Sequence, residues 1–131
     1  MKTLRVLIID DSALVRKVLR EVLEKAGGFE VVDTAMDPVF AVEKIKRLKP
    51  DVLTLDLEMP RMDGLTFLGR LMRSMPIPTL IVSSLAQRGA DVTLRALELG
   101  AFDFVLKPQD ATQLAELSAE LATKLRGAAL A

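Results

Sequence analysis

Short apolar runs alternate five times with longer segments that have the hydrophobic period of an α-helix. Strands are predicted at residues 4–9, 30–35, 52–55, 79–82 and 102–106. Three of these runs, LRVLII, DVLTL and PTLIV, offer apolar residues to both faces of a strand, as expected for strands at the centre of a sheet. The alternation is typical of a parallel sheet that is covered by helices on both faces.

Helix signals follow each apolar run. After the first run, Ser12 is an expected N-cap, and apolar residues recur every three or four positions from Leu14 to Leu23. Further helices are predicted at residues 38–48, 64–72, 90–99 and 111–125, with Asp63 as a second N-cap. Solvated helix faces are expected for the basic residues Arg16, Lys17, Lys44, Lys46 and Arg47.

Five right-handed βα units leave two arrangements, a small open doubly wound sheet or a fragment of a larger barrel. The length of 131 residues favours the open sheet. We therefore predict an α/β protein with the flavodoxin-like (βα)5 fold, a parallel five-stranded sheet in the order 2-1-3-4-5. One domain is expected over residues 1–126, and residues 127–131 are expected to begin a linker or to form a frayed C-terminus.

The composition narrows the chemistry. Lys and Arg number 18, as do Asp and Glu, so no overall positive field attracts nucleic acid or anionic lipid. The chain has no Cys and no His, which excludes disulfides, thiolate or imidazole metal sites and a Ser-His-Asp triad. The apolar run at 4–9 is too short for a signal peptide or a membrane span. We expect a soluble, cytoplasmic protein without direct membrane contact.

Polar residues follow the carboxyl ends of four predicted strands: Asp10-Asp11, Asp56, Ser83-Ser84 and Lys107-Pro108. In the order 2-1-3-4-5 the first and third strands are neighbours where the strand order reverses, so Asp10, Asp11 and Asp56 are expected to lie together. Each feature alone has an ordinary explanation, such as a turn and helix cap for Asp-Asp-Ser. Their shared position at one edge of the sheet favours a common site.

Three carboxylates in one crevice repel one another by roughly 3 kcal/mol per pair at about 5 Å and an effective dielectric constant near 20. Proton uptake or Lys107 would offset part of this repulsion, but Mg²⁺ does so best without any His or Cys ligand. A carboxylate beside Mg²⁺, a hydroxyl and a lysine is suited to phosphoryl transfer, with an aspartyl phosphate as product. Spacing alone leaves open which of the three aspartates is the nucleophile.

Together these residues resemble the receiver domain of bacterial two-component response regulators. The resemblance rests on Asp10-Asp11 after the first strand, Asp56 in DLEMPRMDG, Ser83 in IVSS and Lys107 in LKP, and it covers residues 2 to about 126. It implies that Asp56 accepts a phosphoryl group from a histidine kinase. It also implies that Mg²⁺ is held by the side chains of Asp10, Asp11 and Asp56 and by the backbone carbonyl of Glu58.

The resemblance further implies a switch. Lys107, Ser83 and Ser84 would contact the phosphoryl group, Phe104 would turn inward as Ser83 moves, and the Lys107–Pro108 bond would be cis. The output surface would be the fourth helix, fifth strand and fifth helix. The sequence departs from the family pattern in having Ser83 where Thr is commoner and Phe104 where some relatives have Tyr; neither change removes the required hydrogen bond or the filled pocket.

Two longer stretches, EMPRMDGLTFLGRLM and IVSSLAQRGADVTLRALELGAFDFVLKP, are similar to the receiver of the chemotaxis methylesterases. Members of that family demethylate glutamate methyl esters and deamidate glutamines on chemoreceptors, with a catalytic domain that the receiver covers until it is phosphorylated. Without His this chain cannot form that triad, so we expect a regulatory fragment or a free-standing receiver. The implied partners are a chemotaxis histidine kinase and, for a fragment, the C-terminal methylesterase domain.

Other functions on the same fold are a stand-alone or transcription-factor receiver, a constitutive interaction module with no phosphorylation, and a flavin carrier. The absence of Trp and Tyr, and of a loop rich in glycine and hydroxyl groups after the first strand, disfavours flavin binding. Saturable Mg²⁺ binding would separate a phosphorylated receiver from an interaction module. The only enzymatic chemistry expected of this chain itself is its own phosphorylation and dephosphorylation.

Overall fold

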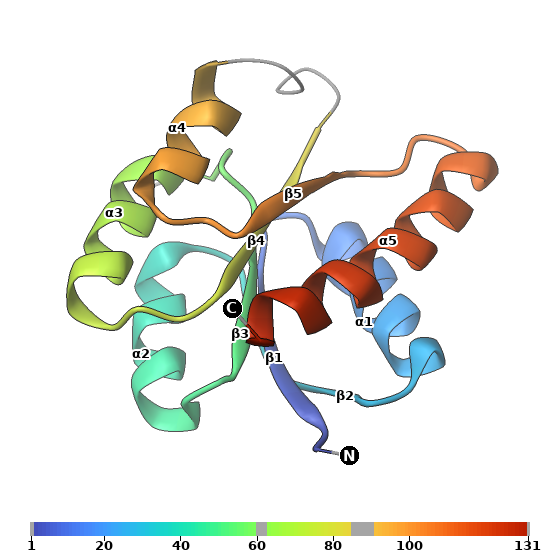
Figure 1. Ribbon diagram of the computed structural model, residues 1–131, viewed down its shortest axis with the longest axis horizontal. Helices are drawn as coiled ribbons and strands as arrows, with labels where there is room; N and C mark the ends of the chain where they lie inside the picture. Colours follow the sequence, from blue (N-terminus) through green and yellow to red (C-terminus); the bar gives the residue numbers. More distant parts are fainter. Residues whose placement is uncertain (1, 60–62, 85–90, 131) are drawn as a thin grey trace.

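The computed structural model describes residues 2–59, 63–84 and 91–130. These residues form a parallel five-stranded sheet with helices on both faces (Figure 1). The strands are β1 (Leu4–Ile9), β2 (Phe29–Ala35), β3 (Val52–Leu55), β4 (Thr79–Ser83) and β5 (Asp103–Leu106), and the helices are α1 (Ala13–Ala26), α2 (Pro38–Leu48), α3 (Gly64–Ser74), α4 (Asp91–Leu99) and α5 (Ala111–Leu130). The strand order β2-β1-β3-β4-β5 confirms the predicted flavodoxin-like fold.

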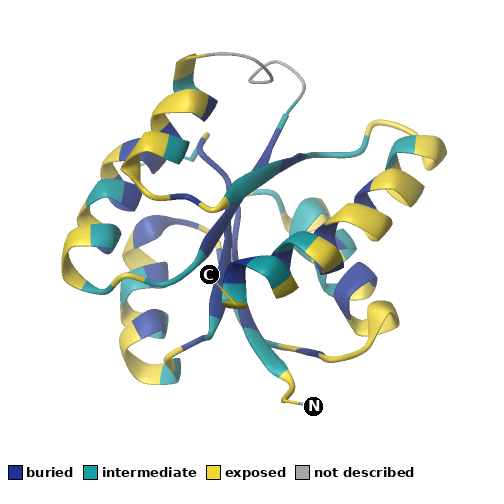
Figure 2. Cartoon of the chain, in the orientation of Figure 1, coloured by how far each residue is buried: buried dark blue, intermediate teal, exposed yellow. Residues whose placement is uncertain are grey.

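Residues in the central strands pack alternately on the two faces of the sheet. Val6 and Ile8 of β1 belong to the core under α1 and α5, whereas Leu7 and Ile9 belong to the core under α2, α3 and α4. β1, β3 and β4 each lie between two strands and are covered on both faces, which explains their continuous apolar runs (Figure 2).

Side-chain caps begin the first three helices. The Ser12 hydroxyl accepts a hydrogen bond from the Val15 N–H at 3.2 Å, and Asp63 accepts one from the Leu65 N–H at 3.2 Å, which confirms both predicted caps. Asp37 caps α2 in the same way, directly before the proline that occupies the first turn. Each cap fixes where a loop at the carboxyl edge of the sheet turns into a helix.

Gly64, the first residue of α3, packs against the chain that follows β3. A Cβ atom on Gly64 would lie 2.6 Å from the Leu57 Cα, so only glycine allows this close approach. The start of α3 is thereby held against the residue next to Asp56, and the β3–α3 connection is positioned from both ends.

The structure differs from the sequence-based expectation at the C-terminus. α5 continues to Leu130, so residues 127–130 are helical rather than a linker or a frayed end. Ala128 is fully buried in the core, and Gly127 brings the helix close to Phe102, where a Cβ would lie 3.3 Å from the ring. Tertiary packing therefore extends the helix.

None of the helices in the described part of the chain is both long and apolar enough to span a bilayer. The expected start of the fourth helix at Ala90 lies outside the described residues.

Candidate functional site

The ends of β1 and β3 bring the buried carboxylates together. Ile9 pairs with Leu55, and the N–H of Asp56 donates to the carbonyl of Ile9 at 3.0 Å. Asp10 and Asp56 are therefore the first residues beyond two neighbouring strands, at the point where the strand order reverses. Carboxylate oxygens of Asp10, Asp11 and Asp56 all lie within 4.8 Å of one another.

Backbone donors fix one oxygen of each buried carboxylate. The Ser12 N–H donates to Asp10 Oδ1 at 2.8 Å, and the Glu58 N–H donates to Asp56 Oδ1 at 3.1 Å. Asp10 and Asp56 are only 1% and 2% exposed, whereas Asp11 lies exposed at the mouth of the crevice. The second oxygens of the two buried carboxylates, both Oδ2, make no hydrogen bond of good geometry.

Lys107 enters this cluster from the end of β5. Its Nζ lies 3.0 Å from Asp10 Oδ2 and 3.3 Å from Asp56 Oδ2. Its backbone N–H donates to the Ser83 carbonyl at 2.7 Å, which holds the ends of β4 and β5 together. One ammonium thus faces two buried carboxylates, with a third carboxylate nearby.

Burial controls the ionisation of the cluster. Burial is the main reason that the pKa of Asp56 rises to about 6; the charge of Asp10 adds to the rise, and the Glu58 N–H and Lys107 oppose it. Burial likewise raises the pKa of Asp10 above its usual range. Burial alone would lower the pKa of Lys107, but the two carboxylates outweigh it and the net change is upward. The site therefore holds more negative charge than its own lysine neutralises.

This donor set fits a hard divalent cation. The two Oδ2 atoms share the single ammonium of Lys107, a third carboxylate lies within reach, and every side chain of the trio offers oxygen, the ligand atom that Mg²⁺ prefers. A metal at this place would stabilise the ionised carboxylates, which burial and their mutual repulsion disfavour. Glu58, whose backbone carbonyl is the expected fourth ligand, lies two residues after Asp56 and is exposed.

Ser83 ends β4 on the other side of Asp56. Its side chain is fully buried and its hydroxyl has no hydrogen-bond partner among the described residues. Because β3 lies between β1 and β4, Asp56 is flanked by the carboxylates on one side and by the end of β4 on the other. The neighbouring Ser84 is half-buried.

Comparison with known proteins decides the family. Residues 6–119 match the response regulator receiver domain. This chain belongs to that family. The match covers every carboxylate of the cluster, Ser83 and Lys107.

Relatives of this receiver domain include chemotaxis proteins. All of the chain aligns at 55% identity with protein-glutamate methylesterase/protein-glutamine glutaminase 1 of Albidiferax ferrireducens, and 97% of it aligns at 57% identity with protein-glutamate methylesterase/protein-glutamine glutaminase 2 of Xanthomonas oryzae pv. oryzae. In both cases the chain spans 36% of the relative's length.

Solved structures agree. The response regulator domain of Thermotoga maritima CheB has a TM-score of 0.90 and 39% identity, over 99% of this chain and 98% of that one. A chain of the CheX–CheY–BeF3–Mg complex from Borrelia burgdorferi has a TM-score of 0.79 and 31% identity, over 95% of this chain and 87% of that one. The receiver domain is thus similar to the regulatory domain of CheB-type methylesterases.

The expected cis peptide bond before Pro108 is wrong for this receiver domain. No peptide bond is cis in the described segments, so the Lys107–Pro108 bond is trans. The trans isomer is the more stable one for an X–Pro bond by about 0.5–1 kcal/mol. With this bond trans, the Lys107 backbone still reaches Ser83 and its ammonium still reaches both carboxylates.

Phe104 lies half-buried on β5, against the core under α2, α3 and α4. Lys124 of α5 connects to this strand in two ways: its Nζ donates to the Phe104 carbonyl at 2.8 Å and lies 5.5 Å from the centre of the ring. The same ammonium lies 3.5 Å from Asp103 and 3.2 Å from Glu120. The structure therefore ties the expected switch residue to α5, through a lysine that sequence reasoning did not single out.

Two further residues near the site were missed. Arg16, expected on a solvated face, instead donates from Nη1 to the Asp10 carbonyl at 2.8 Å and so supports the first carboxylate loop. Thr54, two residues before Asp56, is buried, and its hydroxyl has no hydrogen-bond partner in the described part of the chain. Thr54 could have been noticed as a polar residue inside the apolar run VLTL. Nothing in the spacing of the sequence marked Arg16.

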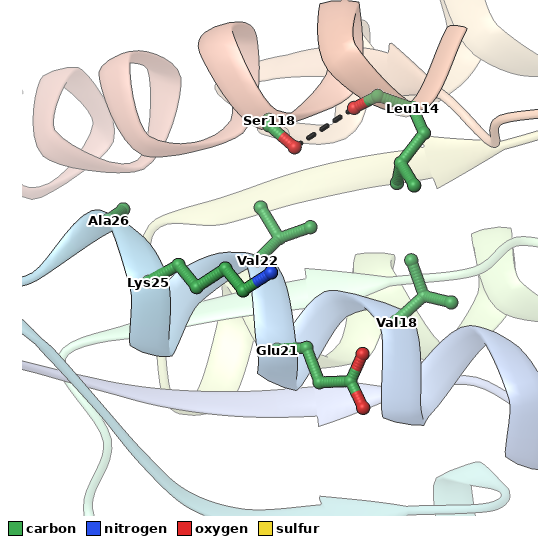
Figure 3. A pocket seen from close by; sticks show the side chains of 7 residues that line it. All are labelled: Val18, Glu21, Val22, Lys25, Ala26, Leu114 and Ser118. Carbon is green, nitrogen blue, oxygen red and sulfur yellow. Dashed lines mark hydrogen bonds between the residues drawn. The ribbon is translucent and has the colours of Figure 1, made fainter. Parts of the chain in front are cut away.

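A groove of ≈ 320 Å³ lies between α1 and α5 (Figure 3). Val18 and Val22 of α1 face Leu114 of α5 across it, and Ser118 donates to the Leu114 carbonyl at 2.9 Å. Glu21 and Lys25 are the charged residues of its lining. The residues that line the groove include none of the three clustered aspartates and neither Ser83 nor Lys107.

Proposed function

We propose that this receiver domain is a phosphorylatable switch in which Asp56 accepts a phosphoryl group from a histidine kinase in a Mg²⁺-dependent reaction. The observation that carries the proposal is the position of Asp56 on the central strand, with two more carboxylates beside it, Ser83 beyond it and Lys107 Nζ at 3.3 Å. A phosphorus atom above Asp56 would be within reach of every group that phosphoryl transfer needs.

The chain's own residues do the following. An oxygen of the Asp56 carboxylate attacks phosphorus in line, the P–N bond of the phosphohistidine breaks, and its electron pair goes to the imidazole nitrogen, which then takes a proton from water. The N–H of Glu58 orients the attacking carboxylate. Lys107 would move its interaction from the carboxylate to a phosphoryl oxygen, and the unpartnered Ser83 hydroxyl would donate to another.

Asp10 and Asp11, with Asp56 and the carbonyl of Glu58, would hold Mg²⁺. When bound, the ion supplies positive charge that neutralises the phosphoryl oxygens. The buried Oδ2 atoms of Asp10 and Asp56, which share one ammonium, support this assignment.

The output would be the face formed by α4, β5 and α5. Leu94 and Leu99 of α4, and Phe102 in the connection from α4 to β5, are exposed and so are available to a partner domain. Since the chain spans about a third of the methylesterase relatives, we propose that the parent protein is such a cytoplasmic methylesterase, and that phosphorylation relieves the receiver's cover over its catalytic domain.

Intact mass after incubation with Mg²⁺ and acetyl phosphate tests the central claim. The chain should gain one phosphoryl group that is stable in acid and labile in base. Asp56→Asn should gain none, whereas the matched variant Asp91→Asn, on the exposed start of α4, should behave as wild type. An unchanged mass for the wild type, or an adduct that persists in Asp56→Asn, would contradict the proposal and favour a constitutive interaction module.

A further inference from the structure

Two side chains bind the backbone of Phe104 at the outer edge of β5. This strand is the last of the sheet and pairs with β4. Lys124 Nζ of α5 donates to the Phe104 carbonyl at 2.8 Å, and the Phe104 N–H donates to Asp103 Oδ1 at 2.7 Å. Asp103 Oδ2 in turn lies 3.5 Å from Lys124 Nζ. The edge strand is therefore joined to α5 at the residue that is expected to switch.

The same ammonium contacts the Phe104 ring. Lys124 Nζ lies 5.5 Å from the ring centre, within the distance at which a cation is attracted to an aromatic face. α5 packs on one face of the sheet through Leu121 and Leu125, whereas the Phe104 side chain packs against the core on the opposite face. The lysine therefore reaches round the edge strand and connects a helix on one face to a ring on the other.

Glu120 helps to hold the ammonium at this place. Its carboxylate lies 3.2 Å from Lys124 Nζ, one turn earlier on α5, and the lysine side chain is 27% exposed. Asp103, Glu120 and the Phe104 carbonyl thus surround one ammonium with three oxygen acceptors. Because these contacts fix the head group between α5 and β5, it would not follow the ring if the ring turned away.

We propose that Lys124 is a positioning residue that holds the Phe104 ring in its unphosphorylated orientation and so opposes the switch. This inference rests on the proposed function and on the expected inward turn of Phe104. Such a turn would break the contact between the ammonium and the ring but keep the hydrogen bond to the carbonyl, since the carbonyl belongs to the strand. The attraction is then present in one state only, which is the condition for a contact to shift a conformational equilibrium.

The partial exposure of the contact sets the size of the effect. Attraction between a cation and a ring at a partly exposed site changes an equilibrium by about two- to fivefold. A shift of this size would leave Asp56 able to accept a phosphoryl group. It would change the fraction of molecules that have already switched before phosphorylation, and with it the apparent affinity for any ligand that binds the switched state better.

A second pair of cation and ring on the same helix provides the matched control. The guanidinium carbon of Arg126 lies 5.0 Å from the centre of the Phe29 ring, which belongs to the start of β2. Lys124→Met and Arg126→Met each remove one cation from one ring, and Lys124→Arg keeps the charge. Two measurements apply to each variant: the rotamer populations of Phe104 from three-bond NMR couplings, and the dissociation constant of beryllofluoride, a mimic of the phosphoryl group, in the presence of Mg²⁺.

We expect Lys124→Met to raise the ratio of inward to outward Phe104 rotamers about two- to fivefold in the unphosphorylated chain, and to lower the dissociation constant of beryllofluoride by a similar factor. Lys124→Arg should restore wild-type values of both. Arg126→Met should leave both unchanged, because its ring lies on β2.

Unchanged Phe104 rotamers in Lys124→Met would overturn the inference, as would a rotamer change without a change in beryllofluoride affinity. Equal changes in Arg126→Met would also overturn it, because they would indicate a general loosening of α5. Failure of the wild type to bind beryllofluoride would count against the proposed function instead. The rotamer populations, which are measured without any phosphoryl mimic, would still decide whether Lys124 positions Phe104.

Discussion

Two aspartates that flank the same strand show what distinguishes the two edges of this sheet. Asp51 precedes β3 and accepts hydrogen bonds from the Arg5 N–H at 2.9 Å and from Lys2 Nζ at 3.3 Å, and the first of these is the main reason that its pKa lies below the usual range. Asp56 follows β3, and burial raises its pKa to about 6. At the amino edge, hydrogen bonds stabilise the ionised form of Asp51. At the carboxyl edge, burial destabilises the ionised form of Asp56.

The same contrast extends to the cations. At the amino edge Arg5 donates to the Leu48 and Lys49 carbonyls, and Arg126 donates to Gly27, so positive charges are matched to local acceptors. At the carboxyl edge Lys107 is the one cation, among the residues that the structure describes, that pairs with Asp10 and Asp56. A surplus of buried negative charge costs stability, and a bound divalent cation would relieve it.

The largest expected effect comes from removing the cation at each edge. Lys107→Met should lower the free energy of unfolding by about 3 kcal/mol at pH 8, because two buried carboxylates lose their partner. Lys2→Met should cost less than about 1 kcal/mol, since that lysine is largely exposed. Urea unfolding at pH 8 and pH 5 measures both.

The Lys107→Met loss should shrink at pH 5, where the carboxylates take up protons instead. Equal losses for the two lysine variants would remove the proposed electrostatic difference between the edges.

Addition of Mg²⁺ should stabilise only through the carboxyl edge. At a concentration of 100 times its dissociation constant, Mg²⁺ should raise the free energy of unfolding by about 2.7 kcal/mol. Asp11→Asn should reduce this gain, and Asp51→Asn should leave it intact. Thermal unfolding measures this gain, and KCl at matched ionic strength is the control. If Mg²⁺ does not stabilise the wild type, a constitutive interaction module is favoured.

The next prediction is that the same substitution, Asp to Asn, changes the free energy of unfolding in opposite directions at the two edges. A carboxyl whose pKa rises from 3.8 to about 6 on folding loses about 3 kcal/mol when it ionises in the folded protein. Asp56→Asn should therefore stabilise the chain at pH 8 by at most about 3 kcal/mol, since the pKa of about 6 already includes the attraction to Lys107. Asp51→Asn should destabilise it by about 1 kcal/mol.

The pH dependence follows from the same two aspartates. Between pH of about 4 and 6 the folded chain binds more protons at Asp56 than the unfolded chain does, so this group makes stability fall as pH rises through that window. The Asp56→Asn gain should accordingly vanish below about pH 4. The contribution of Asp51 is present above its unfolded pKa and is lost as pH falls through the lower folded value. Urea titrations from pH 3 to 8 would show two curves of opposite slope, and parallel curves would refute the comparison.

Most of the fold could be predicted from the sequence because a strand that is buried on both faces has a continuous run of apolar residues. β1, β3 and β4 read as continuous apolar runs since helices cover each of them twice, and Ser12 and Asp63 mark the helix starts that they cap. The end of α5 could not be predicted in this way. Gly127 indicates a helix end by propensity, and the burial of Ala128 and the close approach to Phe102 show why the helix continues.

The grouping of the acidic residues followed from topology alone, because strand order fixes which strand ends are neighbours. The hydrogen-bond partners of long side chains could not be predicted from topology. Arg16 and Lys124 each reach a backbone carbonyl on another element, and such contacts depend on how helices sit against the sheet rather than on spacing along the chain. The isomer of the bond before Pro108 likewise depends on tertiary context, and analogy to the family gave the wrong one.

The smallest expected effect separates the two serines that border the site. Ser12→Ala removes a helix cap and should cost about 1 kcal/mol. Ser83→Ala removes a buried hydroxyl that has no partner in the described structure, so stability should stay within about 0.5 kcal/mol or rise. Its loss should be seen only after phosphorylation, when the hydroxyl would have a phosphoryl oxygen to bind.

Ser83→Ala should therefore still be phosphorylated by acetyl phosphate but should show smaller chemical-shift changes at Phe104 and along α4 and α5, because a phosphoryl group shifts a conformational equilibrium only by the difference in its contacts with the two states. NMR spectra of the phosphorylated wild type, Ser83→Ala and Ser12→Ala would measure this directly. Equal loss of phosphorylation and of the shift changes in Ser83→Ala would place Ser83 in the transfer step and remove it from the switch.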